Sequence, residues 1–290
     1  MNDKICVITG ANSGIGKVTA RELAKQGAHV VMLCRNEEKA ERAKEGILRV
    51  CGHSRVDIVL ADLSSTQQIR SAAERINADC SKIDVLINNA GLITSNTRTT
   101  TDDGFETTFG VNHLAPFLLT QLLLDKVLAS KQGNIINVSS EAHRFASFDL
   151  SDLQYEKRKY NGLKAYCSSK LCNILFTREL SQRLPAHVVT NSLHPGAVAS
   201  NFGGGVPGFF GIVMQLARPF MISEEKGAET SIYLATSEEG FTATGQYFKD
   251  KKVVSPNKEA SNNYNAKRLW EISEQLLQIT FLPQKKAASA

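Results

Sequence analysis

The sequence predicts a doubly wound α/β fold, in which helices cover both faces of a parallel sheet. Short apolar runs alternate with helix-patterned segments along the chain. Several runs, such as 30–33 and 85–87, are continuously apolar, which is typical of parallel strands that are buried on both faces. A glycine-rich turn joins the first apolar run to the first helical segment. Together these three observations predict the fold class.

The expected elements follow one another in a regular order. Strands are expected at the apolar runs 4–9, 28–34, 56–61, 83–87, 133–138 and 187–193. Helices are expected at 14–27, 36–50, 65–80, 105–130 and 160–184, with a last one at 259–279. Segment 118–124 and the helix that starts near Tyr166 are apolar around much of their circumference. Each is therefore buried on more than one side, either within the fold or against a second subunit of a homo-oligomer.

The chain is expected to form a single domain, 1–282, followed by a flexible tail at 283–290. No linker or long charge run divides its 290 residues, and 42% of them are hydrophobic, enough for one large core. Segment 201–222 is expected to be a C-terminal substrate lid, because glycines flank an apolar centre in its first half. Two alternatives stay open for this segment: static core packing, and peripheral contact of 203–214 with a membrane.

Composition and charge exclude several classes of protein. A net charge of +5, spread along the chain, argues against a nucleic-acid partner. The first residues run straight into an apolar run, without the regions of a signal peptide, so a cytoplasmic location is expected. The six cysteines occur singly and suit reduced thiols. The six histidines are scattered without metal-ligand spacing, so no metal site is expected.

The glycine-rich turn predicts a nucleotide site. It reads Thr-Gly-Ala-Asn-Ser-Gly-Ile-Gly from position 9 to 16, directly after the first strand. Glycines let the backbone turn sharply and approach phosphates closely, and the helix that follows offers free N–H groups and a positive dipole end. The expected phosphate contacts are Gly10, Asn12, Ser13, Gly14, Ile15 and Gly16.

The end of the second strand indicates which dinucleotide is bound. Proteins that bind NAD usually place an acidic residue there, whereas this chain has Cys34-Arg35-Asn36. An arginine offers a bidentate partner for a 2′-phosphate, so NADP(H) is the expected cofactor. NAD(H) stays the alternative, because Glu37 and Glu38 lie close to Arg35 in sequence.

A tyrosine and a lysine form the candidate reactive pair. Tyr166 and Lys170 are four residues apart, which places the phenol and the ammonium on one face of a helix. The cation is expected to stabilise a phenolate and to lower the tyrosine pKa from its ordinary value of about 10. A phenol tuned in this way is a general acid or base.

These motifs together resemble the short-chain dehydrogenase/reductase family, and within it the retinol dehydrogenase-like branch, over nearly the whole chain. The family's glycine turn matches 9–16, and its Tyr-x-x-x-Lys pair matches Tyr166 and Lys170. Its adenine-contact position matches Asp62, which is followed by Leu63, and its Asn-Asn-Ala-Gly segment matches 88–91. The resemblance implies a Rossmann-type sheet and an NAD(P)-dependent enzyme.

The resemblance also implies the site residues. The catalytic set would be Asn112, Ser140, Tyr166 and Lys170, with Ser139 as the alternative serine. Tyr166 would transfer the proton, Ser140 would hold the substrate oxygen, and Lys170 would also bind the nicotinamide ribose. Further cofactor contacts would come from Asn89, Ala90, Gly91, Pro195, Gly196, Val198 and Ser200.

The distance between Ser140 and Tyr166 departs from the family pattern, because it is about twice as long as usual. Segment 141–165 is therefore expected to be an inserted loop that lines the substrate cleft, and a decorated surface loop is the alternative. The light-driven protochlorophyllide reductases share several of these motifs. They carry a cysteine where this chain has Ala197, so that similarity is set aside.

The sequence thus predicts an NADP(H)-dependent oxidoreductase that interconverts an alcohol and an aldehyde or ketone of a small apolar substrate. A retinoid, a steroid, a lipid aldehyde or an aromatic ketone would fit this description. The alternative from another class is a catalytically idle NADP(H)-binding sensor or scaffold, which would need only the glycine turn. A zinc-dependent alcohol dehydrogenase is disfavoured by the scattered histidines.

Overall fold

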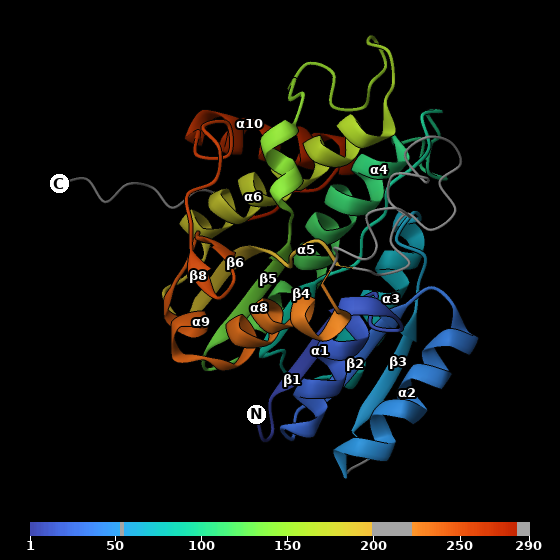
Figure 1. Cartoon of the computed structure of the whole chain (residues 1–290), viewed down its shortest axis with the longest axis vertical. Helices are drawn as coiled ribbons and strands as arrows, with labels where there is room; N and C mark the ends of the chain where they lie inside the picture. The colour runs from blue at the N-terminus through green and yellow to red at the C-terminus, as the bar shows by residue number, and fades with distance from the viewer. Residues whose placement is uncertain (53–54, 199–221, 283–290) are drawn as a thin grey trace, which may run out of the picture.

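The computed structural model describes residues 1–52, 55–198 and 222–282. Within them, one sheet of eight strands runs in the order β3-β2-β1-β4-β5-β6-β7-β8 (Figure 1). All neighbouring strands are parallel except β7 and β8, which form an antiparallel pair. The predicted doubly wound parallel sheet is confirmed.

The six expected strands are present with ends that differ by at most two residues from those predicted. They are β1 (Ile5–Thr9), β2 (His29–Cys34), β3 (Val56–Leu60), β4 (Val85–Asn88), β5 (Gly133–Val138) and β6 (Val188–His194). Two short strands were not predicted, β7 (Tyr247–Lys249) and β8 (Lys252–Val253). They are too short to produce a recognisable periodic pattern.

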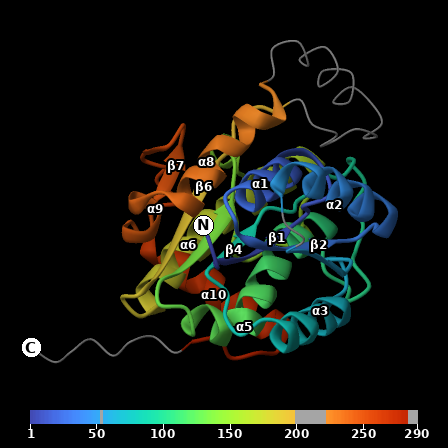
Figure 2. The ribbon, with the colours of Figure 1, turned by 90° about the horizontal axis from the view of Figure 1, so that it is seen from below.

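Helices connect the strands and cover both faces of the sheet. They are α1 (Gly14–Lys25), α2 (Glu37–Cys51), α3 (Thr66–Asp79), α5 (Ala115–Leu128), α6 (Gly162–Arg183), α8 (Glu224–Thr236), α9 (Glu238–Thr242) and α10 (Asn263–Leu277). Figure 2 shows α1 and α2 on one side of the sheet, and α3, α5 and α10 on the other. Helix α8 packs on α1, and α6 packs on α10.

Successive strand residues supply two separate apolar clusters. Val7 and Leu33 belong to the cluster beneath α3, α5 and α6, whereas Ile8 and Met32 belong to the cluster beneath α1 and α2. Side chains of a strand point alternately to the two faces, so both faces must be apolar. This requirement is the reason for the continuous apolar runs in the sequence.

The prediction of one helix over 105–130 is wrong in detail. The chain forms the short α4 (Thr107–Phe109), then a π-helical turn, η1 (Gly110–Leu114), and only then α5. Pro116 lies in the first turn of α5 and has no N–H, so it cannot donate the α-helical hydrogen bond to the carbonyl of Asn112. The register therefore widens at this point, as it does in π-bulges near functional sites.

The C-terminal helix α10 explains the apolar circumference of α5 and α6. Trp270 is buried and its ring lies 4.9 Å from that of Phe117 on α5 and 5.9 Å from that of Phe176 on α6. Both helices are therefore covered by the sheet on one side and by α10 on another. Burial within the fold accounts for their composition without a second subunit.

Some predicted features lie outside the described residues. These are Ser200, all of the expected lid 201–222 except Ile222, the 203–214 segment with its expected membrane contact, and the tail 283–290. Among the described residues, no helix is long and apolar enough to cross a membrane.

Candidate active site

The glycine turn is fastened to the end of β4. The Thr9 hydroxyl oxygen accepts hydrogen bonds from the backbone N–H groups of Asn89 and Ala90, both at 2.9 Å. The Asn89 side-chain amide donates to the Thr9 carbonyl at 2.8 Å. Strands β1 and β4 are neighbours in the sheet, on either side of the point where the strand order reverses. Ligands of doubly wound proteins bind at this switch point.

The turn itself has the shape of a phosphate cradle. Gly10 and Gly14 have positive φ angles of 66° and 56°, in the left-handed region that favours glycine. A Cβ at Gly16 would lie 2.4 Å from the Gly10 carbonyl oxygen and 2.5 Å from Asn89 Nδ2, so no side chain fits there. The side chain of Ser13, at the N-cap of α1, makes no capping hydrogen bond. These residues fit a dinucleotide whose pyrophosphate lies at the start of α1.

Replacing Gly16 by alanine is expected to weaken the cofactor site. The added methyl group meets backbone that cannot move cheaply, so dinucleotide affinity should fall at least about tenfold and stability by about 1–3 kcal/mol. Calorimetric titration and thermal unfolding measure the two effects. Gly46→Ala on α2 is the control, because nothing lies within 4 Å of its Cβ position and it should stabilise the protein slightly. Equal behaviour of the two variants would contradict the cradle.

Arg35 and Asp62 lie at the same edge of the sheet, since the ends of β2 and β3 are paired there. The Arg35 side chain is 72% exposed, and its Nη1 lies 3.5 Å from Asp62 Oδ2. Burial acts to raise the pKa of Asp62, but hydrogen bonds from the N–H and hydroxyl of Ser64, together with the Arg35 guanidinium, hold that pKa below its ordinary value. The guanidinium therefore faces solvent beside an ionised carboxylate. Leu63 packs against the core.

Asn112 lies in the middle of the π turn and is fully buried. Its Oδ1 accepts from the N–H of Leu92 and its Nδ2 donates to the carbonyl of Leu92, both at 2.8 Å. Its Nδ2 also donates to the Ser169 hydroxyl at 3.0 Å. A Cβ at Gly91 would lie 3.2 Å from Lys170 Nζ and 3.4 Å from Asn112 Oδ1. Gly91 thus lets the backbone approach both predicted catalytic side chains closely.

Tyr166 and Lys170 share one face of α6, as predicted. Lys170 Nζ lies 5.6 Å from the centre of the Tyr166 ring and donates to the Val138 carbonyl at 3.1 Å. The Lys170 side chain is almost fully buried, whereas Tyr166 is partly exposed. The Lys170 ammonium is therefore fixed by the end of β5, beside the Tyr166 ring.

The sequence predicted that Lys170 lowers the pKa of Tyr166, and the structure does not bear this out. Burial raises the pKa of Tyr166, and the hydrogen bond with Ser140 acts in the opposite direction. Burial also lowers the pKa of Lys170 from 10.5 to about 8. Removing both groups from water disfavours both charged forms. The expectation that Tyr166 is acidic from its lysine neighbour is thus corrected, and the residue linked to a lower tyrosine pKa is Ser140.

The two serines at the end of β5 face different ways. The Ser139 hydroxyl is buried and donates to the Lys170 carbonyl at 2.6 Å. Ser140 is partly exposed, caps the short helix η2 (Glu141–Phe145) by accepting from Ala142 N–H at 3.2 Å, and bonds to Tyr166. Ser139 therefore ties β5 to α6, while Ser140 reaches the phenol.

The segment after β6 closes the other side of the site. Gly196 has a φ of 100°, and a Cβ there would lie 2.3 Å from Ile222 Cδ1. A Cβ at Gly227 on α8 would lie 2.4 Å from Val198 Cγ2 and 3.2 Å from Ile15 Cγ1. The structure therefore brings Val198, after Pro195 and Gly196, next to the start of α1.

The segment 141–165 begins with η2 and continues as a packed loop, seen in yellow-green at the top of Figure 1. Asp152 accepts hydrogen bonds from the N–H groups of Glu156, Lys157 and Arg158. The Arg158 guanidinium stacks over the Tyr155 ring at 4.0 Å. Hydrogen bonds and stacking give this loop a defined shape, although it lacks regular secondary structure.

The sequence did not single out several residues that hold the site together. The Ser169 hydroxyl links Asn112 to the Tyr166 carbonyl, and the Val138 carbonyl accepts from both Lys170 and Asn173. Ser169 lies between the paired residues on α6, and this position is the only sequence signal for it. The role of Val138 rests on its backbone carbonyl and has no such signal.

The arrangement as a whole defines a class of protein. A dinucleotide cradle and a Tyr–Lys–Ser–Asn group meet at the carboxyl ends of β1, β4 and β5. Among the described residues, no three His, Cys, Asp or Glu side chains cluster so as to hold a metal ion. A phenol beside a nicotinamide site can exchange a proton with an alcohol or carbonyl oxygen. These features are those of an NAD(P)-dependent oxidoreductase.

Comparison with known proteins identifies the family. The sequence model of the short chain dehydrogenase family matches residues 4–206. Human retinol dehydrogenase 13 is 44% identical over 280 residues, covering 94% of this chain and 84% of the relative. Human retinol dehydrogenase 12 is 44% identical over 277 residues, covering 95% and 87%. The chain therefore belongs to the short-chain dehydrogenase/reductase family and is retinol dehydrogenase-like, as its motifs indicated.

Solved structures agree with this assignment. An uncharacterised protein from Mycobacterium paratuberculosis has a TM-score of 0.78 and 32% identity, with 97% of this chain and 96% of that chain covered. A short chain dehydrogenase from Escherichia coli complexed with NADPH has a TM-score of 0.69 at 24% identity, with 86% and 96% covered. The second similarity shows the fold alone.

Proposed function

We propose that this enzyme is an NADP(H)-dependent oxidoreductase that interconverts an alcohol and an aldehyde or ketone of an apolar substrate. The observation that carries the proposal is the convergence of Tyr166, Ser140 and Lys170 beside the glycine cradle. Tyr166 is a partly exposed residue, which supports the approach of a substrate to this group. A protein that only senses the cofactor would not need this group.

Each side chain has a distinct proposed role. A bound nicotinamide dinucleotide would supply the hydride donor or acceptor. Tyr166 gives or takes the proton at the substrate oxygen, and the Ser140 hydroxyl holds that oxygen as its charge changes. Lys170 supplies a buried positive charge near the phenol and, by the family resemblance, binds the ribose. Although burial lowers the pKa of Lys170 to about 8, most of the amine is still protonated at neutral pH.

Asn112 is proposed to act mainly by holding the site in shape. Its side chain uses both polar atoms on Leu92 and Ser169. The family resemblance also implies that Asn112 organises a water relay to Lys170. With the side chain occupied, we propose that such a relay would start from the main-chain carbonyl of Asn112. Pro116 cannot donate the α-helical bond to this carbonyl.

The preference for NADP(H) is proposed from Arg35. An exposed guanidinium at the end of β2 supports recognition of a 2′-phosphate, whereas the ionised Asp62 at 3.5 Å moderates it. Arg35→Gln is expected to weaken NADPH binding about 10- to 100-fold and to leave NADH binding nearly unchanged, because charge-assisted hydrogen bonds to the phosphate are lost. Calorimetric dissociation constants for both cofactors test this.

The control for that experiment is Arg42→Gln on α2, where the exposed arginine pairs with Glu38 at 2.9 Å. It should leave both dissociation constants unchanged. If wild-type protein bound NADH more tightly than NADPH, the proposed preference would be abandoned.

The apolar substrate class is proposed from two exposed apolar side chains that are near the catalytic residues in sequence. Phe145 and Leu163 are 78% and 42% exposed, and they lie close in sequence to Ser140 and Tyr166 respectively. Exposed apolar side chains near a reactive centre support an apolar ligand. The relatives named retinol dehydrogenases support the same class.

Turnover on a panel of carbonyl compounds tests the function directly. Consumption of NADPH with retinal, a steroid ketone, a long-chain aldehyde and an aromatic ketone should be detected for at least one substrate. If NADPH binds but no carbonyl is reduced, and no corresponding alcohol is oxidised with NADP⁺, the result would favour the sensor instead.

A cytoplasmic location is also proposed. All six cysteines are free thiols, which supports this location.

A further inference from the structure

The position of Ser140 is determined by the short helix that follows it. The Ser140 carbonyl accepts from the backbone N–H of His143 at 3.1 Å and from His143 Nδ1 at 2.7 Å. The Ser140 hydroxyl also accepts from Ala142 N–H at 3.2 Å. His143 is fully buried. Two of these three bonds therefore come from one histidine, and the hydroxyl also bonds to Tyr166.

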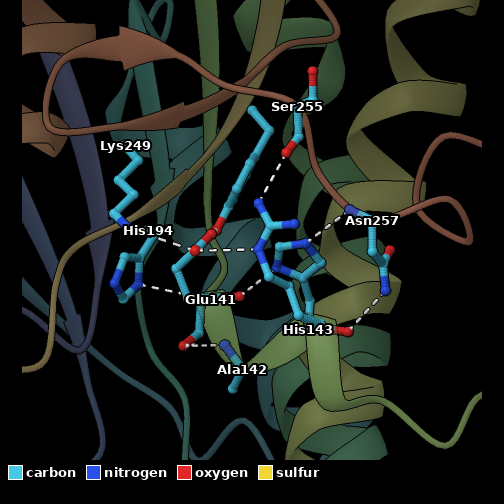
Figure 3. A network of polar contacts seen from close by, with 10 residues as sticks. Glu141, Ala142, His143, His194, Lys249, Ser255 and Asn257 are labelled. Carbon is cyan, nitrogen blue, oxygen red and sulfur yellow. Dashed lines mark hydrogen bonds and ion pairs between the residues drawn. The ribbon is translucent and has the colours of Figure 1, made fainter.

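His143 is held in turn by Asn257, 114 residues further along the chain. The backbone N–H of Asn257 donates to His143 Nε2 at 3.2 Å, and Asn257 Nδ2 donates to the His143 carbonyl at 3.1 Å (Figure 3). Because Nε2 accepts, the proton lies on Nδ1, which must donate to Ser140. Burial lowers the pKa of His143 below its ordinary value, which favours this neutral form.

The surroundings brace this contact from other strands. Glu141 N–H donates to His194 Nδ1 at the end of β6, and Glu141 Oε1 accepts from the Tyr247 hydroxyl on β7 at 3.0 Å. The Tyr247 ring meets the His143 ring edge-on, with 5.0 Å between centres. Arg144 Nη2 donates to the Ser255 carbonyl at 2.9 Å. Figure 3 shows His194, Ser255 and Asn257 around the Glu141–His143 part of η2, at the end of β6 and in the segment after β8.

We propose that His143 and Asn257 form a latch through which the 255–257 segment sets the orientation of Ser140 towards Tyr166. In this role both are positioning residues: they act by holding the Ser140 main chain, and through it the direction of the serine hydroxyl. The inference rests on the proposed function, because it assigns a means of aligning the same catalytic group. The 255–257 segment would thereby affect turnover through Ser140 rather than through the glycine cradle.

Three substitutions separate the two ends of the latch. In His143→Gln, the side-chain amide lies where Nε2 was, so it can accept from Asn257 N–H but cannot donate to the Ser140 carbonyl. In His143→Asn, the shorter amide lies where Nδ1 was, so it can donate to the Ser140 carbonyl but cannot accept from Asn257 N–H. Asn257→Asp keeps the oxygen that accepts from Ala260 N–H and places an acceptor against the His143 carbonyl. His187→Asn is the control, because the His187 ring bonds to the Leu128 carbonyl at the amino end of β6, whereas the latch lies at the carboxyl ends of the strands.

The measurements are kcat, the NADPH dissociation constant and the unfolding temperature. We expect His143→Gln and Asn257→Asp to lower kcat on the order of tenfold with NADPH affinity within about twofold of wild type, since small misplacements of a catalytic group are costly. His143→Asn should retain more turnover than His143→Gln. In a Ser140→Ala background, where residual turnover is followed at high enzyme concentration, Asn257→Asp should change kcat less than about twofold.

Wild-type turnover distinguishes failure of the latch from failure of the proposed function. If wild-type protein reduces no carbonyl, the proposed function fails. If wild type is active and all three variants match it, the latch is refuted. An equal loss of kcat from Asn257→Asp with and without the Ser140 hydroxyl would also refute it, because the effect would then be a general structural one.

Discussion

Tyr166→Phe should lower kcat by about 100- to 10,000-fold, the usual range for loss of a general acid or base. The substitution removes only the hydroxyl that bonds to Ser140, and the ring remains in place beside Lys170. NADPH affinity should change little, because the cradle is built by the turn after β1 and by the end of β4. Steady-state turnover and calorimetric titration measure the two quantities.

Tyr264→Phe is the matched control for this result. Tyr264 lies on α10 with 70% of its surface exposed, so loss of its hydroxyl should change neither turnover nor binding. Near-normal kcat in Tyr166→Phe would move the chemistry away from this tyrosine. A large loss of NADPH affinity would instead assign the hydroxyl to cofactor binding.

Lys170→Met should have two opposite effects, a large loss of turnover and a gain in stability. Turnover falls because a positive charge buried beside the phenol is removed, and a decrease of about 100-fold or more is expected. Stability rises because the fold lowers the pKa of this lysine from 10.5 to about 8, so keeping it protonated opposes folding. The Val138 carbonyl still accepts from Asn173 Nδ2 at 3.3 Å in the variant.

The gain in stability should depend on pH in a defined way. Below pH 8 the wild-type lysine is charged in both states, and the full penalty of about 3 kcal/mol opposes folding. Between pH 8 and 10.5 the unfolded chain binds more protons than the folded one, so wild-type stability rises relative to the variant. The advantage of Lys170→Met should therefore disappear near pH 10.5.

Thermal unfolding of both proteins between pH 7 and 10.5 measures this difference, which corresponds to several degrees at pH 7. Lys164→Met, at an exposed position on the same helix, is the control and should show no such trend. A variant that is less stable than wild type at pH 7 would show that the ammonium stabilises the fold.

The strands were predictable because burial on both faces demands a continuous apolar run, as at Val30–Leu33 and Val85–Ile87. Strands β7 and β8 were not, because three and two residues carry no period. The helix expected over 105–130 was misjudged for a different reason. Pro116 is compatible with the first turn of a helix, and only the structure shows that α5 begins there after a π turn.

The candidate site was predictable where local spacing determines geometry. The glycine turn and the Tyr166–Lys170 spacing depend on a few consecutive residues, and both have the expected geometry. The pKa values of Tyr166 and Lys170 were not predictable from the sequence. The sequence indicates that an ammonium lies near a phenol, but the effect on the tyrosine pKa depends on how much water each group loses.

By itself, the sequence predicted the fold class, the glycine cradle and the Tyr166–Lys170 pair, because each follows from periodicity or spacing over short stretches, whereas Ser140 and Asn112 were implied by the family resemblance. Only the tertiary structure decided that Ser140, and not Ser139, bonds to Tyr166. It also decided that the Gly91 backbone lies close to Asn112 and Lys170, and that Asn257 bonds to His143. These contacts join residues from different strands and loops. Their geometry depends on how the whole sheet and its helices pack, and the sequence around each residue carries no record of the partner.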